Sequence, residues 1–145
     1  MSLTEFANLS HLQVLAFRDC DNMKFLFNET QQLSSLETLS VHSCGLLTLP
    51  GWIGGAVDTL ETLLIYDLPN LKTLPECLTT MTRLKRIHIS DCPQLLSLPS
   101  DLYRLTALEY LCIYGCPELY RKYEPLYGEY WLMIAHIQNT SIIEA

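Results

Sequence analysis

Residues 84–95 read LKRIHISDCPQL and residues 108–119 read LEYLCIYGCPEL, so one pattern occurs twice at a spacing of 24 residues. The spacing extends along most of the chain, because leucine occupies positions 12, 36, 60, 84 and 108. Five further columns are apolar in all five copies, and their first members are Leu9, Leu15, Phe17, Cys20 and Met23. A recurrence with a period of roughly 20–50 residues predicts a protein built from stacked structural repeats.

Each copy has the form L-x-x-L-x-(apolar)-x-x-(C or L)-x-x-L, which is the leucine-rich-repeat pattern. The middle of the unit alternates with period two, and this predicts a short strand with one buried face. After Pro75 and Pro99, leucine and methionine step by threes, which favours a short helical or 3₁₀ leg. We therefore expect an α/β repeat, a leucine-rich-repeat solenoid with five 24-residue coils. Its concave face would be a parallel β-sheet and its convex side a row of short legs.

The period ends after Leu119. We expect residues 1–119 to form the solenoid, with an incomplete N-terminal end, and residues 120–145 to form a C-terminal capping tail outside the repeat. The tail offers these apolar residues for packing on the last coil: Leu126, Tyr130, Trp131, Ile134 and Ile137. Tyr130, Ile134 and Ile137 are spaced as one face of a short helix. We expect a buried Trp131 with a hydrogen-bonded His136 nearby.

Strand residues between the buried columns are expected to point outward, onto the concave face. These outward columns vary in size and chemistry, whereas the inward columns are uniformly apolar. Tyrosine and arginine are enriched at the centres of protein interfaces. The candidate partner-binding residues are Arg18, His42, Leu64, Tyr66, Arg86, His88, Tyr110 and Tyr114. The alternative is an ordinary solvated sheet face.

The composition excludes several classes of function. The net charge is −7 and the isoelectric point near 4.9, which argues against a nucleic-acid surface. No apolar run is long enough for a membrane span, and the first residues do not resemble a signal peptide, so we expect a cytoplasmic protein.

The cysteines do not predict a metal site. Cys20, Cys44, Cys92 and Cys116 share one inward column, in which a thiol acts as a small buried apolar group and a weak donor. A zinc ion requires ligands that converge on a point, whereas these lie along a line.

No sequence feature indicates catalysis. His88 and Cys112 fall in one outward column on adjacent coils, but a Cys–His dyad there would lack an orienting third group and a cleft. The chain has no phosphate-binding loop of the form G-x-x-x-x-G-K-[ST]. We expect no enzymatic activity, no cofactor and no metal.

The end of the chain carries a more specific signal. Cys116-Pro117-Glu118-Leu119 leads into a segment that contains Gly128-Glu129, Trp131, Ile134 and His136-Ile137. This resembles the C-terminus of plant intracellular immune receptors of the coiled-coil nucleotide-binding leucine-rich-repeat class. Their last repeat often carries a Cys-Pro-x-Leu motif and leads into Gly-Glu-Asp-Trp-x-x-Ile-x-His-Ile. Here Tyr130 stands in place of the usual Asp and Met133 in place of a common Lys.

The resemblance implies a protein-recognition module of a disease resistance protein. In that family the repeat domain senses a pathogen effector or a guarded host protein, and it restrains the receptor's own nucleotide-binding module. Phe6, Leu9 and Leu12 step by threes like the leg of a preceding coil, so we interpret the chain as the C-terminal part of a longer receptor or as a truncated relative. The alternatives are an intracellular repeat scaffold that binds a signalling protein and, less in keeping with the motifs, a secreted repeat protein.

Overall fold

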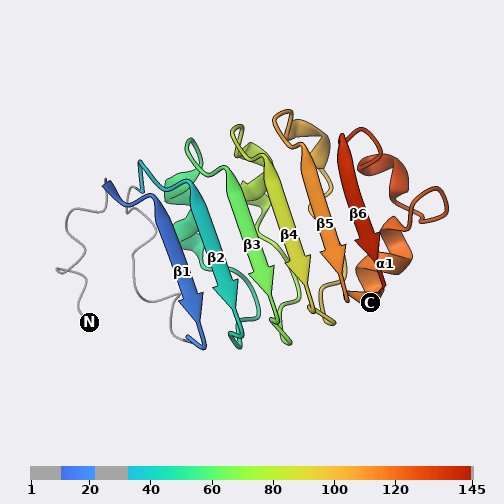
Figure 1. Ribbon diagram of the computed structural model, residues 1–145, viewed down its shortest axis with the longest axis horizontal. Helices are drawn as coiled ribbons and strands as arrows, with labels where there is room; N and C mark the ends of the chain where they lie inside the picture. Colours follow the sequence, from blue (N-terminus) through green and yellow to red (C-terminus); the bar gives the residue numbers. More distant parts are fainter. Residues whose placement is uncertain (1–10, 22–32, 145) are drawn as a thin grey trace.

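The computed structural model describes residues 11–21 and 33–144. These residues form one parallel sheet in which the strands lie side by side in chain order (Figure 1). The six strands are β1 (Val14–Arg18), β2 (Thr38–His42), β3 (Thr62–Tyr66), β4 (Arg86–Ser90), β5 (Tyr110–Tyr114) and β6 (Asn139–Ile143). The predicted parallel sheet is confirmed. From β1 to β5, each residue pairs with the residue 24 positions later in the next strand, as Val14 does with Thr38.

Short helical legs connect the strands and lie behind the sheet in Figure 1, which leaves the other face uncovered. Three of them are the 3₁₀ helices η4 (Gly51–Ala56), η5 (Glu76–Thr80) and η6 (Leu102–Arg104). Pro50 and Pro75 immediately precede η4 and η5 in an extended conformation, with φ of −67° and −69°. Proline fixes φ near these values and ends the extended run, so the predicted position of these legs is confirmed.

The core lies between the sheet and the legs. Strands β2 to β5 each contribute two fully inward residues, and η4, η5 and η6 each contribute at least one side chain: Trp52, Leu78 and Leu102. The inward strand residues of β2 to β5 are at most 3% exposed: Leu39, Val41, Leu63, Ile65, Ile87, Ile89, Leu111 and Ile113. Burial of each such side chain contributes about 1.5–3 kcal/mol, which is why these columns accept only apolar residues.

A left-handed turn follows each of the first five strands. Asp19, Ser43, Asp67 and Asp91 have φ between 53° and 55°, and Gly115 has φ of 67°. Aspartate is one of the few residues with a side chain that adopts this conformation without a large penalty. A Cβ on Gly115 would also lie 2.5 Å from the Asp91 carboxylate, so a larger residue there would require the Asp91 side chain to move.

The inward cysteines link neighbouring coils through their thiols. The Cys44 Sγ donates to the His42 carbonyl at 3.2 Å and accepts a hydrogen bond from the Cys20 backbone N–H at 3.4 Å. Cys116 repeats this arrangement with the carbonyl of Tyr114 and the N–H of Cys92. The hydrogen bond that Cys92 shares with Cys116, together with burial, raises the pKa of the Cys92 thiol, which therefore stays protonated. The predicted structural role of this column is confirmed.

The tail after Leu119 differs from the expectation in one main respect. Asn139 to Ile143 form β6, a further parallel strand whose first residue pairs with Tyr110, 29 residues earlier. The repeat pattern predicts a sheet that ends at the fifth coil, and it predicts a cap for this segment. The longer spacing hides the strand from a search at a period of 24, because α1 (Pro117–Tyr123) and η7 (Trp131–Met133) occupy the extra length.

Packing of the tail side chains is confirmed for only some of the expected residues. Ile134 and Ile137 are buried, whereas Trp131 and Tyr130 are half-buried. The expected helical face is a single 3₁₀ turn, because the backbone N–H of Ile134 bonds to the Trp131 carbonyl three residues back. Two expectations are wrong: Leu126 is 77% exposed, and Trp131 is only half-buried, with an exposed His136 in the same segment.

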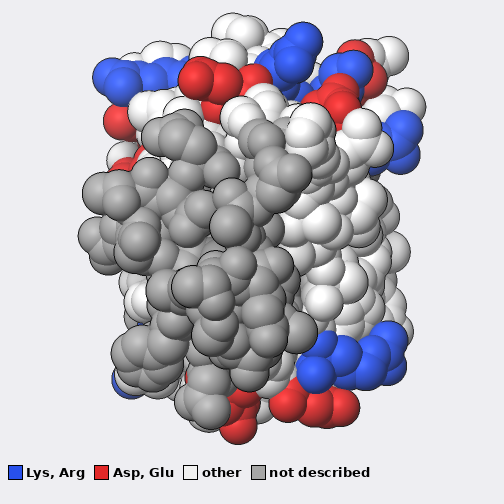
Figure 2. Space-filling view, turned by 90° about the vertical axis from the view of Figure 1, so that its left-hand side faces the viewer, with Lys and Arg blue, Asp and Glu red and all other residues white. Residues whose placement is uncertain are grey.

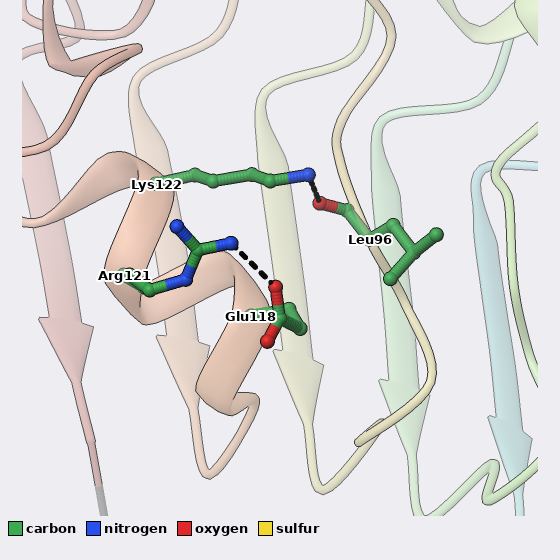
Figure 3. Close-up of polar contacts among 4 residues, drawn as sticks. All are labelled: Leu96, Glu118, Arg121 and Lys122. Carbon is green, nitrogen blue, oxygen red and sulfur yellow. Dashed lines mark hydrogen bonds and ion pairs between the residues drawn. The ribbon is translucent and has the colours of Figure 1, made fainter.

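Helix α1 attaches the tail to the preceding coil (Figure 3). The Lys122 ammonium donates to the Leu96 carbonyl at 2.7 Å, and Arg121 pairs with Glu118 along the helix at 2.8 Å. The buried Tyr123 hydroxyl accepts a hydrogen bond from the Leu98 backbone N–H at 3.1 Å. The sequence analysis did not identify Tyr123, although it contributes the largest side chain that α1 buries.

Gly128 allows the chain to fold back on α1. A Cβ at this position would overlap the Lys122 carbonyl oxygen and the Glu124 backbone nitrogen. The close approach lets Tyr130 donate its backbone N–H to the Lys122 carbonyl at 2.8 Å. Glycine is therefore required at this position.

The structure does not test the expectations for the N-terminal leg and for the domain boundary. Phe6 and Leu9, which suggested a preceding leg, lie outside the described residues, and the boundary proposed after residue 119 stays a prediction. In the described part of the chain, no helix is long and apolar enough to cross a membrane.

Replacing Tyr123 with Phe should lower the free energy of unfolding by about 1–3 kcal/mol, because the buried Leu98 N–H loses its acceptor while the ring still fills its site. Chemical denaturation monitored by circular dichroism measures this. Tyr120→Phe is the matched control, since this hydroxyl bonds only to the side chain of Glu124 near the surface and its loss should change stability by no more than about 0.5 kcal/mol. Equal stability of the two variants would contradict the assigned role of Tyr123.

Replacing Ile134 with Ala should lower the free energy of unfolding by about 2–5 kcal/mol, because it leaves a cavity between the tail and the sheet. Leu132→Ala, two residues away at a side chain that is 85% exposed, should change it by about 0.5 kcal/mol or less. Thermal denaturation of both variants measures the difference. If the two melt together, the tail does not pack as described.

Candidate protein-binding face

The uncovered face of the sheet carries three outward residues from each strand, and we call it the open face. Its columns follow the strand register: Val14–Thr38–Thr62–Arg86–Tyr110–Asn139, Ala16–Ser40–Leu64–His88–Cys112–Ser141 and Arg18–His42–Tyr66–Ser90–Tyr114–Ile143. The structure therefore brings all the candidate residues to one surface. Strand β6 adds Asn139, Ser141 and Ile143, which the sequence analysis missed because it did not predict that strand.

Three stacked rings cross the centre of the open face. The His42 and Tyr66 rings are 4.5 Å apart and nearly parallel, and the Tyr66 and His88 rings are 4.8 Å apart and tilted by 39°. The Ser40 hydroxyl and His42 Nε2 are hydrogen-bonded at 2.7 Å, which holds the outer ring in place. These contacts give the face a rigid aromatic surface that spans β2, β3 and β4.

Arg86 and Tyr110 form a second group near the start of the strands. The Arg86 guanidinium lies over the Tyr110 ring, 4.3 Å from its centre. Such a cation–π contact orients the charge and leaves its N–H groups available for an anion. Beside Tyr110, a shallow pocket of about 320 Å³ is lined by Cys112, Asn139, Ser141 and their neighbours on β5 and β6.

The remaining candidates surround these two groups. Leu64 is half-buried between the outward residues of β2 and β4, and Tyr114 is 41% exposed near the ends of the strands. Arg18 is exposed at the end of β1. The positions are those that the alternation predicts, but the ring contacts between coils could not be read from the sequence.

Charge is distributed unevenly around the open face. None of the outward residues of the six described strands is acidic, although the chain has 16 acidic and 9 basic residues. Carboxylates instead border the strands: Glu37, Glu61 and Glu109 immediately precede β2, β3 and β5, and Asp19, Asp67 and Asp91 immediately follow β1, β3 and β4. Figure 2, which looks onto the β1 end of the sheet, shows charged side chains of both signs gathered at the top and bottom of the molecule, where the strands begin and end.

His88 and Cys112 are register partners on adjacent strands, as the Cys–His alternative requires. Burial raises the pKa of the Cys112 thiol, an effect that its hydrogen bond with Ser141 partly offsets. Burial also lowers the pKa of His88. Both shifts are opposite to those that activate a cysteine nucleophile, which needs a thiolate beside an imidazolium.

Metal ligands do not gather on the described part of the chain. Within residues 11–21 and 33–144, no group of three or more His, Cys, Asp or Glu side chains could hold a metal ion. All six cysteines have free thiols.

Comparison with known proteins adds no assignment. No protein-family model matches this chain, and no curated protein matches its sequence.

The His88 imidazole should titrate below its usual pKa of 6.5, because burial disfavours the charged ring. Below pH 6.5 the unfolded chain therefore takes up this proton more readily than the folded chain. The free energy of unfolding should consequently fall as the pH is lowered through the interval between the two pKa values. An NMR titration of the ring protons, assigned with His88→Gln, measures the midpoint, and a midpoint at or above 6.5 would contradict the burial of this ring. Denaturation at several pH values should show a weaker acid dependence in His88→Gln than in the parent.

Proposed function

We propose that this chain is a leucine-rich-repeat module that binds a protein partner through its open face. The observation that carries the proposal is the row of ordered aromatic rings on the one uncovered face of a parallel sheet. Protein interfaces draw much of their binding energy from tyrosine and arginine, whose side chains bury large areas at low entropic cost. Here the rings are held by their neighbours before any partner arrives, so little further ordering would be needed.

The fold supports a binding role. A solenoid of this kind presents an extended surface, while its stability comes from the inward columns and the stacking of neighbouring coils. Outward residues can therefore change without loss of the fold. The outward residues of the open face do vary, because its three columns contain aliphatic, aromatic, hydroxyl, thiol and cationic side chains.

We further propose that the module belongs to a plant disease resistance protein of the coiled-coil nucleotide-binding leucine-rich-repeat class. The support is the resemblance of Cys116-Pro117-Glu118-Leu119 and of the segment from Gly128 to Ile137 to the C-terminus of that family. The module would act in the cytoplasm without catalysis. It would sense a pathogen effector or a guarded host protein. Until it does so, it would restrain the receptor's nucleotide-binding module.

The gene offers the most direct test of this family. A phosphate-binding loop encoded in the same open reading frame would support the receptor, because the family combines the two modules in one chain. A complete reading frame without such a loop would favour the alternative, a repeat scaffold that binds a signalling protein.

Replacing Tyr66, Tyr110 and Tyr114 with Ala should weaken the binding of a protein partner by about 2 kcal/mol or more, because the ring surface is lost. The matched control replaces Arg104 and Thr80, which lie in the legs behind the sheet, with Ala. Candidate partners retained from plant extract by the parent are purified, and their dissociation constants for the three proteins are measured by calorimetry. Circular dichroism establishes that the variants are folded. Unchanged affinity for the tyrosine variant, with loss in the control, would contradict binding through the open face.

A further inference from the structure

The open face is the part of the described surface where the charge of the chain is reversed. The molecule carries a net charge of −7, yet the outward strand positions have two arginines, two histidines and no carboxylate. A partner segment that lies along a strand would meet carboxylates at both ends and none at the centre. Complementary charge at such a surface selects the partner and its orientation.

Arg86 is the cation best placed to receive an anion on this face. Its guanidinium is exposed and held over the Tyr110 ring, and it forms no ion pair with another described residue. Its neighbour Lys85, in contrast, pairs with Glu61 at 3.3 Å. A guanidinium oriented in advance loses little side-chain entropy when it binds a carboxylate through two N–H groups.

The aromatic row supplies the apolar part of the same site. His88, the ring at one end of this row, lies two residues after Arg86 on β4, whereas Tyr66 lies near the other end of β3. The carboxylates that border a strand, such as Glu61 and Asp67, are six residues apart, a distance of roughly 20 Å. An extended segment of about seven residues therefore spans the distance between the carboxylates at the two edges.

We infer that the open face recognises a protein segment in which an acidic residue and an aromatic or aliphatic residue stand two positions apart, flanked by basic residues. The acidic side chain pairs with Arg86, the apolar side chain packs on the His88 end of the aromatic row, and the basic flanks meet the carboxylates at the edges, such as Glu109 and Asp91. This inference rests on the proposed function, since it specifies the partner of the same surface.

The experiment uses the full 145-residue chain and a random 12-residue peptide library displayed on phage. Peptides enriched on the parent should share an Asp or Glu two positions from an apolar residue, with Lys or Arg on both sides. Fluorescent synthetic copies are then titrated against the parent, Arg86→Glu, Arg86→Gln and the charge-matched control Arg104→Glu. We expect affinity to fall by about tenfold or more with Arg86→Glu, to fall less with Arg86→Gln and to stay unchanged with Arg104→Glu. Arg86→Gln introduces no new charge, so it provides the same test if the glutamate variant is poorly folded.

Charge reversal in the peptide completes the test. Replacing its central acidic residue with Lys should abolish binding to the parent and restore binding to Arg86→Glu. Enriched peptides that need the three tyrosines but have no acidic centre, or that ignore Arg86, would overturn this inference and leave the proposed function standing. Peptides that need neither Arg86 nor the tyrosines, or a library that shows no enrichment over the tyrosine variant, would overturn both.

Discussion

Backbone hydrogen bonding between neighbouring coils is the constraint on which the rest of this structure depends. The N–H groups of Glu37, Glu61, Lys85 and Glu109 each donate to the carbonyl 24 residues earlier, at 2.8–2.9 Å. A single coil has no partner for these groups and cannot bury its own apolar face, so each coil is stable only beside another. Because the offset is constant, equivalent residues of successive coils lie in straight columns. All residues of one column therefore have the same surroundings.

This constraint explains why much of the fold could be predicted. Columns with one environment accept one kind of residue, so the leucine, cysteine and turn positions recur with the period of the hydrogen bonds. The strands β1 to β5 follow directly from that recurrence, and the prolines before η4 and η5 mark where these legs begin. Strand β6 obeys the same hydrogen bonding, since Asn139 donates to Glu109 at 2.9 Å, but it reaches this position after a longer excursion through α1 and η7. Its period therefore could not be recognised, and Tyr123, which has no equivalent in other coils, could not be identified.

The positions of the candidate residues could be predicted from the sequence, but the contacts between their side chains could not. Alternation along a strand places Tyr66, Arg86 and His88 on the outward face, since successive side chains point to opposite sides. Whether two such side chains touch depends on rotamers and on the neighbouring coil, which no spacing encodes. The ring stack from His42 to His88 and the position of Arg86 over Tyr110 are contacts of this kind. The sequence also could not show that Arg86 stays unpaired among the described residues while Lys85 is neutralised by Glu61.

The acidic edge at the ends of the strands follows in part from the fold itself. The residue after each of the first five strands adopts a left-handed conformation, which aspartate tolerates better than most residues do. Asp19, Asp67 and Asp91 are therefore suited to the turn before any partner is considered, and the Asp67 carboxylate accepts a hydrogen bond from the Ser43 hydroxyl in the adjacent turn. The outward strand positions are under no such backbone demand, yet they contain no carboxylate. The contrast between a structurally favoured acidic edge and an open face with arginines, aromatic rings and no carboxylate is thus a property that the stability of the repeat does not require, and the proposed role in recognition would account for it.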